Sequence, residues 1–323
     1  MFKIFIFEKI IIKCIAIIFE IFILYNIHFS HITSQYIHHD KKNKRKTRIF
    51  TFWEPRQKIP GYIQLCLNTW KKFLPEYEII ILDYQITEKY LGNELFSNVI
   101  CKNMTLQIQA DAIRVAILYK YGGIWMDADT ILLSGNCIKN LKNYDLAMIG
   151  DDRIKKQDIG FIYSSNNSSL IKSWLNEIII KIKKYKKIIY LKNKTHSSKV
   201  SLKKYKTWSY LGNGIIDKFL KNTTSNNFYR IDRNKLNTFP ERKFYRNSTF
   251  RNKKKYRLFY FRKRDPQIVL NETRDIILLH NSWTPRKYKK MSITEFLNED
   301  ILLSKLLDKI LSKNIKLFNF LIL

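Results

Sequence analysis

The sequence predicts an α/β fold built around one open sheet, and three observations support this prediction. Short runs of β-branched and aromatic residues alternate with longer runs of apolar residues at helical spacing. Acidic residues follow several of the apolar runs directly. The chain has 323 residues, of which 46% are hydrophobic, so it can bury a sizeable core. Strands that alternate with helices favour a sheet that binds its ligands at the carboxyl ends of the strands.

The elements can be assigned in chain order from these patterns. Prolines bound the predicted helical segment 59–73, and Gly122 fits a left-handed cap at the end of the predicted helix 105–121. The predicted strands are 48–53, 77–82, 124–127, 146–149 and 159–163, and the predicted helical segments are 59–73, 85–98, 105–121 and 170–184. Residues 185–260 are rich in Lys, Asn and Tyr and give no clear periodicity, but they are too aromatic to be predicted as disordered.

The strongest functional signal is a D-x-D pair, Asp127 and Asp129, at the end of the apolar strand 124–127. In a strand, residues two apart project to the same side. Two such carboxylates suit a hard cation such as Mg²⁺ or Mn²⁺, which takes oxygen ligands and keeps several waters. The structural alternative is a turn that follows a strand. A D-x-D pair is weak evidence alone, and its neighbours strengthen it.

Those neighbours lie on the preceding helix and at its end. Asp111 and Arg114 are three residues apart on the predicted helix, and Gly122–Gly123 follow it. The structural alternatives are a surface ion pair for Asp111 with Arg114, and a simple helix stop for the glycines. Together with the D-x-D they favour a site for a nucleotide-sugar, whose diphosphate needs positive charge. Gly122 and Gly123 are therefore predicted donor-binding residues.

The stretch ADAIRVAILYKYGGIWMDADTILL, residues 110–133, resembles the signature of the DxD-containing glycosyltransferases of the capsular polysaccharide synthesis type. These are related to α-mannosyltransferase-like and DxD sugar-binding-region glycosyltransferases. Segments 51–55 (TFWEP), 59–83 and 278–285 (LLHNSWTP) agree with the resemblance. It implies a GT-A-like fold, in which a single nucleotide-binding α/β domain carries additional N- and C-terminal helices. It also implies metal-dependent transfer of a hexose from a UDP- or GDP-sugar, with retention of configuration.

The resemblance also assigns roles to individual residues. Asp111 and Arg114 match the pair that holds the nucleoside and sugar of the donor, and Asp127 and Asp129 match the acids that hold metal and diphosphate and are catalytic. Trp53 matches the aromatic residue beside the base.

Three further assignments are more distant in the chain. His280 and Trp283 match a C-terminal element that closes over the diphosphate, with His280 as a metal or phosphate ligand and Trp283 as a donor-binding side chain that excludes water. Asp152 follows strand 146–149 and is predicted to reach the donor sugar; the alternative is a loop acid. Residues 211–214 (LGNG) occupy the place of a glycine-containing loop near the acceptor, without the proline usual there.

Both ends of the chain predict helices. Residues 1–30 are apolar, with charges that suit an interfacial helix or a poorly spanning anchor, although a true span and a docked helix are alternatives. A basic linker, 31–47, follows. The predicted domain then divides into a donor half, 48–150, and an acceptor half, 151–298, which includes the HNSW element. Residues 299–323 contain an amphipathic helix, docked on the domain or lying on a membrane.

The charge and the cysteines limit the possible partners and compartment. Lys and Arg number 59 against 27 Asp and Glu, but Ile, Asn and Tyr are enriched with them, so the excess indicates composition drift rather than a nucleic-acid groove; the alternative is a surface that meets acidic lipid or glycan. The four cysteines form no close pair, which favours a reducing compartment. We therefore expect a membrane-associated enzyme on the cytoplasmic face with a glycan or glycolipid acceptor; a lumenal type II protein is the alternative. Competing functions are a non-catalytic basic protein that binds anionic glycan, membrane or nucleic acid, and another metal-dependent phosphate enzyme.

Overall fold

The computed structural model describes residues 46–151, 156–195, 205, 207, 209–221, 228–233, 249–273 and 275–312. The described residues from Thr47 onward form one compact unit. The predicted N-terminal helix, nearly all of the basic linker and Asp152 lie outside the described residues.

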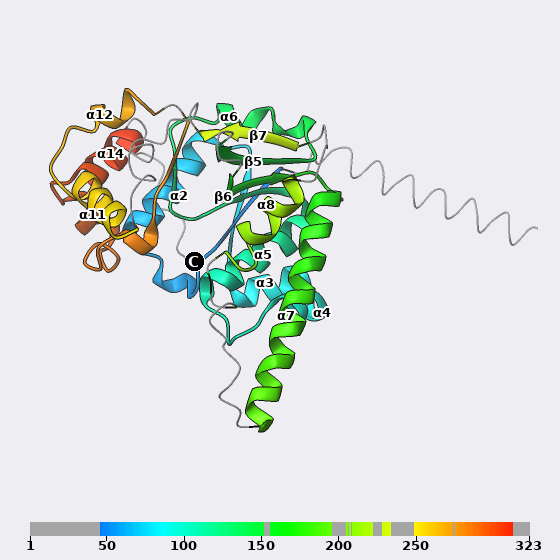
Figure 1. Ribbon diagram of the computed structural model, residues 1–323. Coiled ribbons are helices and arrows are strands. Elements are labelled where there is room, and N and C mark those ends of the chain that lie inside the picture. The colour runs from blue at the N-terminus through cyan, green and yellow to red at the C-terminus, as the bar shows by residue number, and fades with distance from the viewer. Residues whose placement is uncertain are drawn as a thin grey trace, which may run out of the picture. The chain divides into compact units, whose positions relative to one another are not determined.

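A six-stranded mixed sheet forms the centre of this unit, in the order β2-β1-β3-β6-β5-β7 (Figure 1). The strands are β1 (Arg48–Phe52), β2 (Glu78–Leu82), β3 (Gly123–Met126), β5 (Leu146–Asp151), β6 (Lys156–Ser164) and β7 (Phe228–Asp232). Within this sheet β6 alone runs against the others, since it is antiparallel to both β3 and β5, whereas the remaining pairs are parallel. The predicted α/β fold with an open mixed sheet is confirmed.

The strand register brings the ends of β1, β2 and β3 and the beginning of β6 to one edge of the sheet. Phe52 pairs with Leu82 and Phe50 pairs with Trp125, so β1, β2 and β3 end on the same side. Met126 pairs with Phe161 in the antiparallel β6, so the beginning of β6 lies beside the end of β3. Ligands of open α/β sheets bind at this carboxyl edge.

Alternate residues of the strands face two separate cores. On β1, Ile49 belongs to the core on one face and Phe50 to the core on the other, as the period of two requires. The first core lies under α2 (Gly61–Phe73), α11 (Thr249–Tyr260), α13 (Ile293–Leu297) and α14 (Leu302–Leu311). The second lies under α3 (Tyr84–Leu91), α4 (Asn93–Val99), α5 (Leu106–Tyr121), α7 (Ser169–Thr195) and α8 (Asn213–Lys221).

A small second sheet joins distant parts of the chain on the first face. It consists of β4 (Thr130–Leu132), which follows the D-x-D pair, and β8 (Ile276–Leu278), paired antiparallel. The short helical elements are η1 (Arg56–Lys58), α6 (Asn136–Lys139), η2 (Leu141–Asn143), α12 (Gln267–Leu270) and η4 (Asn281–Trp283).

The predicted C-terminal amphipathic helix is present as α14, and its apolar residues are buried in the first core. Of the two alternatives for its apolar face, docking on the domain is therefore the observed one. Within the described ranges, no helix is long and apolar enough to span a membrane.

Candidate active site

The D-x-D pair lies in a turn between two strands, not within a strand. β3 ends at Met126, and the backbone N–H of Thr130 donates a hydrogen bond to the carbonyl of Asp127 at 3.0 Å before β4 begins. The expectation that Asp127 and Asp129 project to one side as strand neighbours was therefore wrong. The turn directs Asp127 toward α5 and β6, and Asp129 toward the segment after β8.

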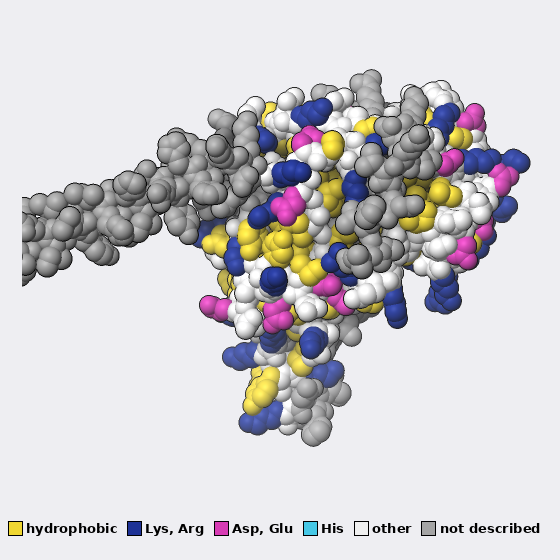
Figure 2. Space-filling model, turned by 180° about the vertical axis from the view of Figure 1, so that it is seen from behind, with side chains coloured by type: hydrophobic (Ala, Val, Ile, Leu, Met, Phe, Trp, Pro, Cys, Tyr) yellow, Lys and Arg dark blue, Asp and Glu magenta, His cyan; other side chains and the backbone are white. Residues whose placement is uncertain are grey.

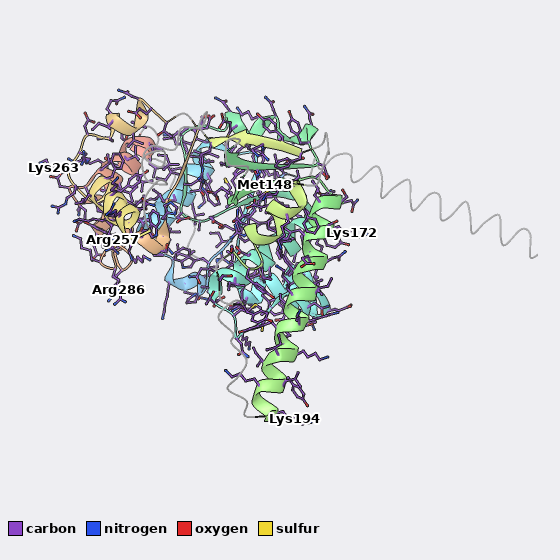
Figure 3. The ribbon with its side chains drawn as sticks, in the orientation of Figure 1. Met148, Lys172, Lys194, Arg257, Lys263 and Arg286 are labelled. Atoms are coloured by element: carbon purple, nitrogen blue, oxygen red, sulfur yellow. The ribbon has the colours of Figure 1, made fainter. Side chains whose placement is uncertain are left out.

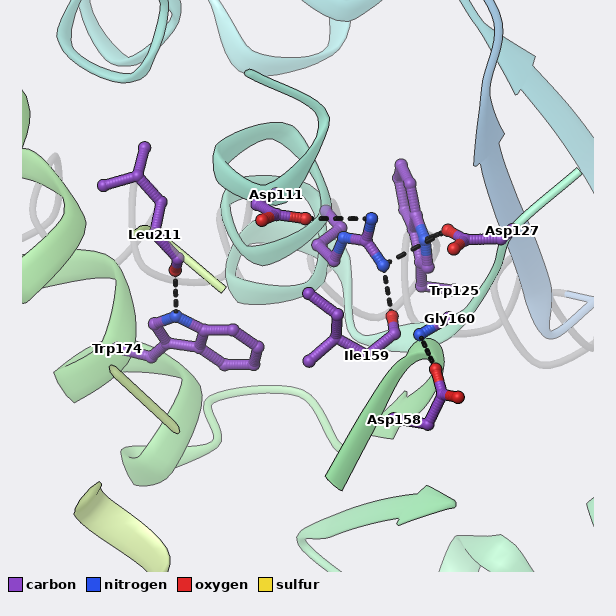
Figure 4. A network of polar contacts seen from close by, with 9 residues as sticks. Asp111, Trp125, Asp127, Asp158, Ile159, Gly160, Trp174 and Leu211 are labelled. Carbon is purple, nitrogen blue, oxygen red and sulfur yellow. Dashed lines mark hydrogen bonds and ion pairs between the residues drawn. The ribbon is translucent and has the colours of Figure 1, made fainter. Parts of the chain in front are cut away.

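Arg114 connects the predicted donor-binding pair to the D-x-D turn (Figure 4). Its guanidinium lies 3.1 Å from Asp111 Oδ1 and 3.2 Å from Asp127 Oδ1, and it donates a hydrogen bond to the carbonyl of Ile159. The guanidinium carbon also lies 5.1 Å from the centre of the Trp125 ring, close enough for a cation–π interaction. Arg114 is only 5% exposed, so the alternative of a surface ion pair is wrong.

The three carboxylates occupy different electrostatic environments. Burial raises the pKa of Asp111 to about 7, although the Arg114 guanidinium opposes that rise. Burial and the nearby charge of Asp127 raise the pKa of Asp129 to about 7. The Asp127 side chain is 41% exposed and also accepts a hydrogen bond from Trp125 Nε1 at 2.9 Å. Of the three, Asp111 is buried, whereas Asp127 and Asp129 are half-buried residues at the sheet edge.

The C-terminal HNSW element lies directly against the D-x-D turn. The backbone N–H of Asn281 donates to Asp129 Oδ2 at 2.6 Å, and the N–H of Leu279 donates to the Asp129 carbonyl at 3.2 Å. The Asn281 side-chain oxygen accepts a hydrogen bond from the Tyr62 hydroxyl of α2 at 2.6 Å. The predicted proximity of this element to the D-x-D pair is therefore present, and Asn281, which the sequence did not single out, provides the contact.

His280 and Trp283 form an aromatic group beside Asp129. Their ring centres are 4.1 Å apart, and the edge of each ring meets Tyr256 of α11. His280 interacts electrostatically with Asp129. In the described part of the chain, however, no three His, Cys, Asp or Glu side chains are arranged to hold one metal ion, so Asp127, Asp129 and His280 do not form a three-residue ligand set.

The other predicted residues are placed at varying distances from this group. Trp53 follows β1 at the carboxyl edge, where its N–H donates to the Leu82 carbonyl at 2.9 Å. Gly122 and Gly123 both have positive φ, which favours glycine, but they lie at the opposite end of β3 from Asp127. There a side chain on Gly123 would approach the carbonyl of Arg48 to 2.7 Å. The structure thus gives the glycine pair the helix-stop role and does not bring it to the site.

Two residues that the sequence analysis missed border Asp127. A β-carbon on Gly160 would lie 3.1 Å from both Asp127 Oδ2 and Asp158 Oδ1, so these two carboxylates face the same small space. Asp158 also accepts a hydrogen bond from the Gly160 N–H at 2.9 Å and forms an ion pair with Arg233. The signal in the sequence is the D-x-G triplet at the beginning of β6, which has one carboxylate where the D-x-D pair has two and is less specific.

The glycine-containing loop at 211–214 lies against the buried pair. A β-carbon on Gly212 would approach Ile159 Cδ1 to 2.5 Å and Asp111 Oδ2 to 2.7 Å. The Leu211 carbonyl accepts a hydrogen bond from Trp174 of α7 at 2.8 Å. The loop therefore packs behind Asp111, and only glycine leaves room for that carboxylate.

The carboxylate oxygens of the D-x-D turn suit a divalent cation that is bound by few protein ligands. Among the described residues, no hydrogen bond is made to Asp127 Oδ2, and this oxygen belongs to a half-exposed carboxylate at the sheet edge. Carboxylate oxygens are the ligands that Mg²⁺ and Mn²⁺ prefer, and one or two suffice when diphosphate and water complete the shell. Asp127 Oδ2 can supply one such ligand, whereas Asp129 Oδ2 already accepts a hydrogen bond from the Asn281 N–H.

The comparison with protein-family models agrees with the motif resemblance. A family model described as "Capsular polysaccharide synthesis protein" matches residues 22–264. Among solved structures, the chain is similar to the "PaToxG Glycosyltransferase", with 17% sequence identity and a TM-score of 0.33, over 54% of this chain and 67% of that one. The comparison with curated proteins found no match. The family match ends before the HNSW element, which the structure nevertheless joins to the D-x-D turn.

Proposed function

The chain belongs to the capsular polysaccharide synthesis family, and on this premise we propose that it is a metal-dependent glycosyltransferase. It transfers a hexose from a UDP- or GDP-sugar to a polysaccharide or glycolipid acceptor, with retention of configuration. The observation that supports this function best is the placement of Asp127. Its Oδ1 is fixed by Arg114 and Trp125, while its Oδ2 is directed toward the space beside Gly160 at the carboxyl edge of the sheet.

The residues of the site have different proposed roles according to their positions. Asp127 and Asp129 would hold Mn²⁺ or Mg²⁺, and the bound ion supplies positive charge to the departing diphosphate. Arg114 keeps Asp127 oriented through their ion pair. Trp283 and His280 cover the side of the turn next to Asp129 and exclude water from a donor that is prone to hydrolysis.

Retention of configuration needs either a nucleophile or a front-face transfer. Asp127 and Asp158 face one space, yet both are already bound by arginines, and a carboxylate held in this way is a poor nucleophile. Front-face transfer, in which the acceptor hydroxyl attacks on the side that the diphosphate leaves, is therefore the mechanism that we propose. Asp152 remains a predicted contact to the donor sugar.

A donor hydrolysis assay tests this function without knowledge of the acceptor. Release of UDP or GDP from a panel of nucleotide-sugars is measured with Mn²⁺ and with a chelator, for the full chain and for the D127N and D129N variants. We expect metal-dependent release that falls by at least about a hundredfold in both variants. Glu94→Gln, at an exposed carboxylate of α4, is the matched control and should retain activity. Activity that is unchanged in both aspartate variants would overturn the proposal.

The same assay separates the alternative functions. A non-catalytic basic protein would release no nucleotide from any donor although it binds anionic glycan.

We also propose that the enzyme works at the cytoplasmic face of a membrane, with a lumenal type II arrangement as the alternative. Carbonate extraction of the full chain, compared with a chain that lacks residues 1–40, tests the contribution of the N-terminal segment; equal extraction of the two would oppose it.

A further inference from the structure

Helix α7 is much longer than the core that it covers. It has 27 residues, from Ser169 to Thr195, and its C-terminal half extends beyond the other helices of its layer (Figure 1). Its inward side is anchored: Trp174 is fully buried and bonded to the Leu211 carbonyl, and the Tyr185 hydroxyl donates to the Asn103 carbonyl at 3.2 Å. The opposite side of the helix therefore has a fixed outward direction.

The outward side carries a stripe of lysines interrupted by large apolar side chains. We define the outward stripe as Ile180, Lys183, Lys187, Tyr190 and Lys194, whose spacings of three and four residues place them on one helical face. All five are exposed, and the two apolar members are 59% exposed at Ile180 and 62% at Tyr190.

The charged side chains of α7 are positive along most of its length. Eight lysines occur between residues 169 and 195, against one acidic residue, Glu177. Figure 3 shows Lys172 and Lys194 near the two ends of α7, and Figure 2 shows basic and apolar side chains next to each other on the part of the unit that projects. The exposed side chains of Ile180 and Tyr190 gain nothing in water, and they lie in line with the lysines of the stripe.

We propose that the outward stripe of α7 docks on an anionic membrane surface. Lysine ammonium groups reach the lipid phosphates while their methylene stems stay along the helix. Tyr190 is amphipathic and suits the headgroup region, and Ile180 enters the acyl boundary. Nucleic acid would use the lysines but offers nothing to Ile180, and a neutral glycan would use neither. The net charge of +32 adds a long-range attraction to the same surface.

This inference deepens the proposed membrane association by assigning a surface to it, but its test measures binding alone. Failure of the donor hydrolysis assay would leave it standing, and loss of vesicle binding would leave the catalytic proposal standing. None of the stripe residues belongs to the candidate active site.

Sedimentation with vesicles tests the charge of the stripe. The full chain is mixed with vesicles of phosphatidylcholine, with and without a third of phosphatidylglycerol. Each lysine near an anionic surface contributes about fivefold to partitioning, so K183E, K187E and K194E together should weaken binding at least about a hundredfold. The matched control reverses three exposed lysines elsewhere, Lys89, Lys139 and Lys142, and should lose clearly less.

A fluorescent probe tests the location directly, so that binding by another segment does not hide the result. An environment-sensitive dye is attached to the new thiol of Tyr190→Cys or, as the control, of Ile268→Cys, and the signal of the unsubstituted chain labelled in the same way is subtracted. We expect its emission to rise and shift to the blue when anionic vesicles are added, whereas a dye at position 268, which is also exposed, should not respond. A probe at 190 that stays in water while the protein is bound would overturn the proposal. So would equal loss in the charge variant and its control, or binding to heparin in place of vesicles.

Discussion

Replacing Arg114 with methionine tests how the carboxylates of Asp111 and Asp127 are held in place. Methionine keeps an unbranched stem but removes the charge, so Asp111 loses its cation while it stays buried. Removing one partner of a buried ion pair costs about 3–5 kcal/mol, because the other charge is left without compensation. We expect R114M to lower the free energy of unfolding by about this amount at pH 8, as measured by urea denaturation. Arg56→Met, the same change at an exposed arginine, should cost less than about 1 kcal/mol.

The pH dependence of this effect gives a second, independent measure. In the folded protein the pKa of Asp111 is raised to about 7, whereas an unfolded aspartate titrates near about 3.9. The folded state therefore holds an extra proton between these values, and this group lowers stability progressively as the pH rises through that window and then levels off. By pH 8 the cost is about 4 kcal/mol. In R114M the pKa rises further, so the loss of stability continues above pH 7.

The destabilisation by R114M should consequently be larger at pH 8 than at pH 6. Adding Asp111→Asn removes the buried charge, so the double variant should be more stable than R114M alone at pH 8. A destabilisation below about 1 kcal/mol, or one of equal size at both pH values, would refute the argument that Arg114 acts by neutralising Asp111.

Three further predictions concern the D-x-D turn. Gly160→Ala places a methyl group 3.1 Å from Asp127 Oδ2, so we expect about tenfold weaker Mn²⁺ binding by titration calorimetry with little change in melting temperature; unchanged affinity would contradict this. Since the pKa of Asp129 is about 7 without metal, Mn²⁺ must displace a proton below that pH, and the apparent affinity should fall about tenfold per pH unit below 7 and level off above it. Tyr62→Phe removes the hydroxyl bonded to Asn281 and should cost about 1–2 kcal/mol of unfolding free energy, with a value near zero as the contrary result.

Local sequence patterns were sufficient for most of the central sheet. Apolar runs bounded by proline, glycine or aspartate gave β1, β2 and β3 nearly to the residue, and helical spacing gave α5. The pairing of Arg114 with Asp111 was also predictable from their spacing of three residues. The contact of Arg114 with Asp127 was not, because the 12 intervening residues could place the strand in several registers relative to the helix.

The D-x-D turn shows where local pattern is insufficient. The sequence Asp-Ala-Asp alternates as a strand does, and its conformation is decided by the pairing of Thr130–Leu132 with Ile276–Leu278, far along the chain. Asp158 was missed for a similar reason, since its significance depends on β6 lying beside the end of β3. The outer half of α7 gave little periodic signal because few of its residues are buried.

The bond between Asn281 and Asp129 has a consequence for how the protein is made. These two residues are 152 positions apart. On the ribosome, Arg114 and Trp125 can engage Asp127 soon after β3 emerges, whereas Asp129 must wait for the synthesis of β8 and the HNSW element. The Asp127 carboxylate is thus fixed earlier than the Asp129 carboxylate, which takes its position only after the fold around Asp127 exists. Nascent chains arrested before residue 276 should therefore contain the contact between Arg114 and Asp127 without the bond between Asn281 and Asp129.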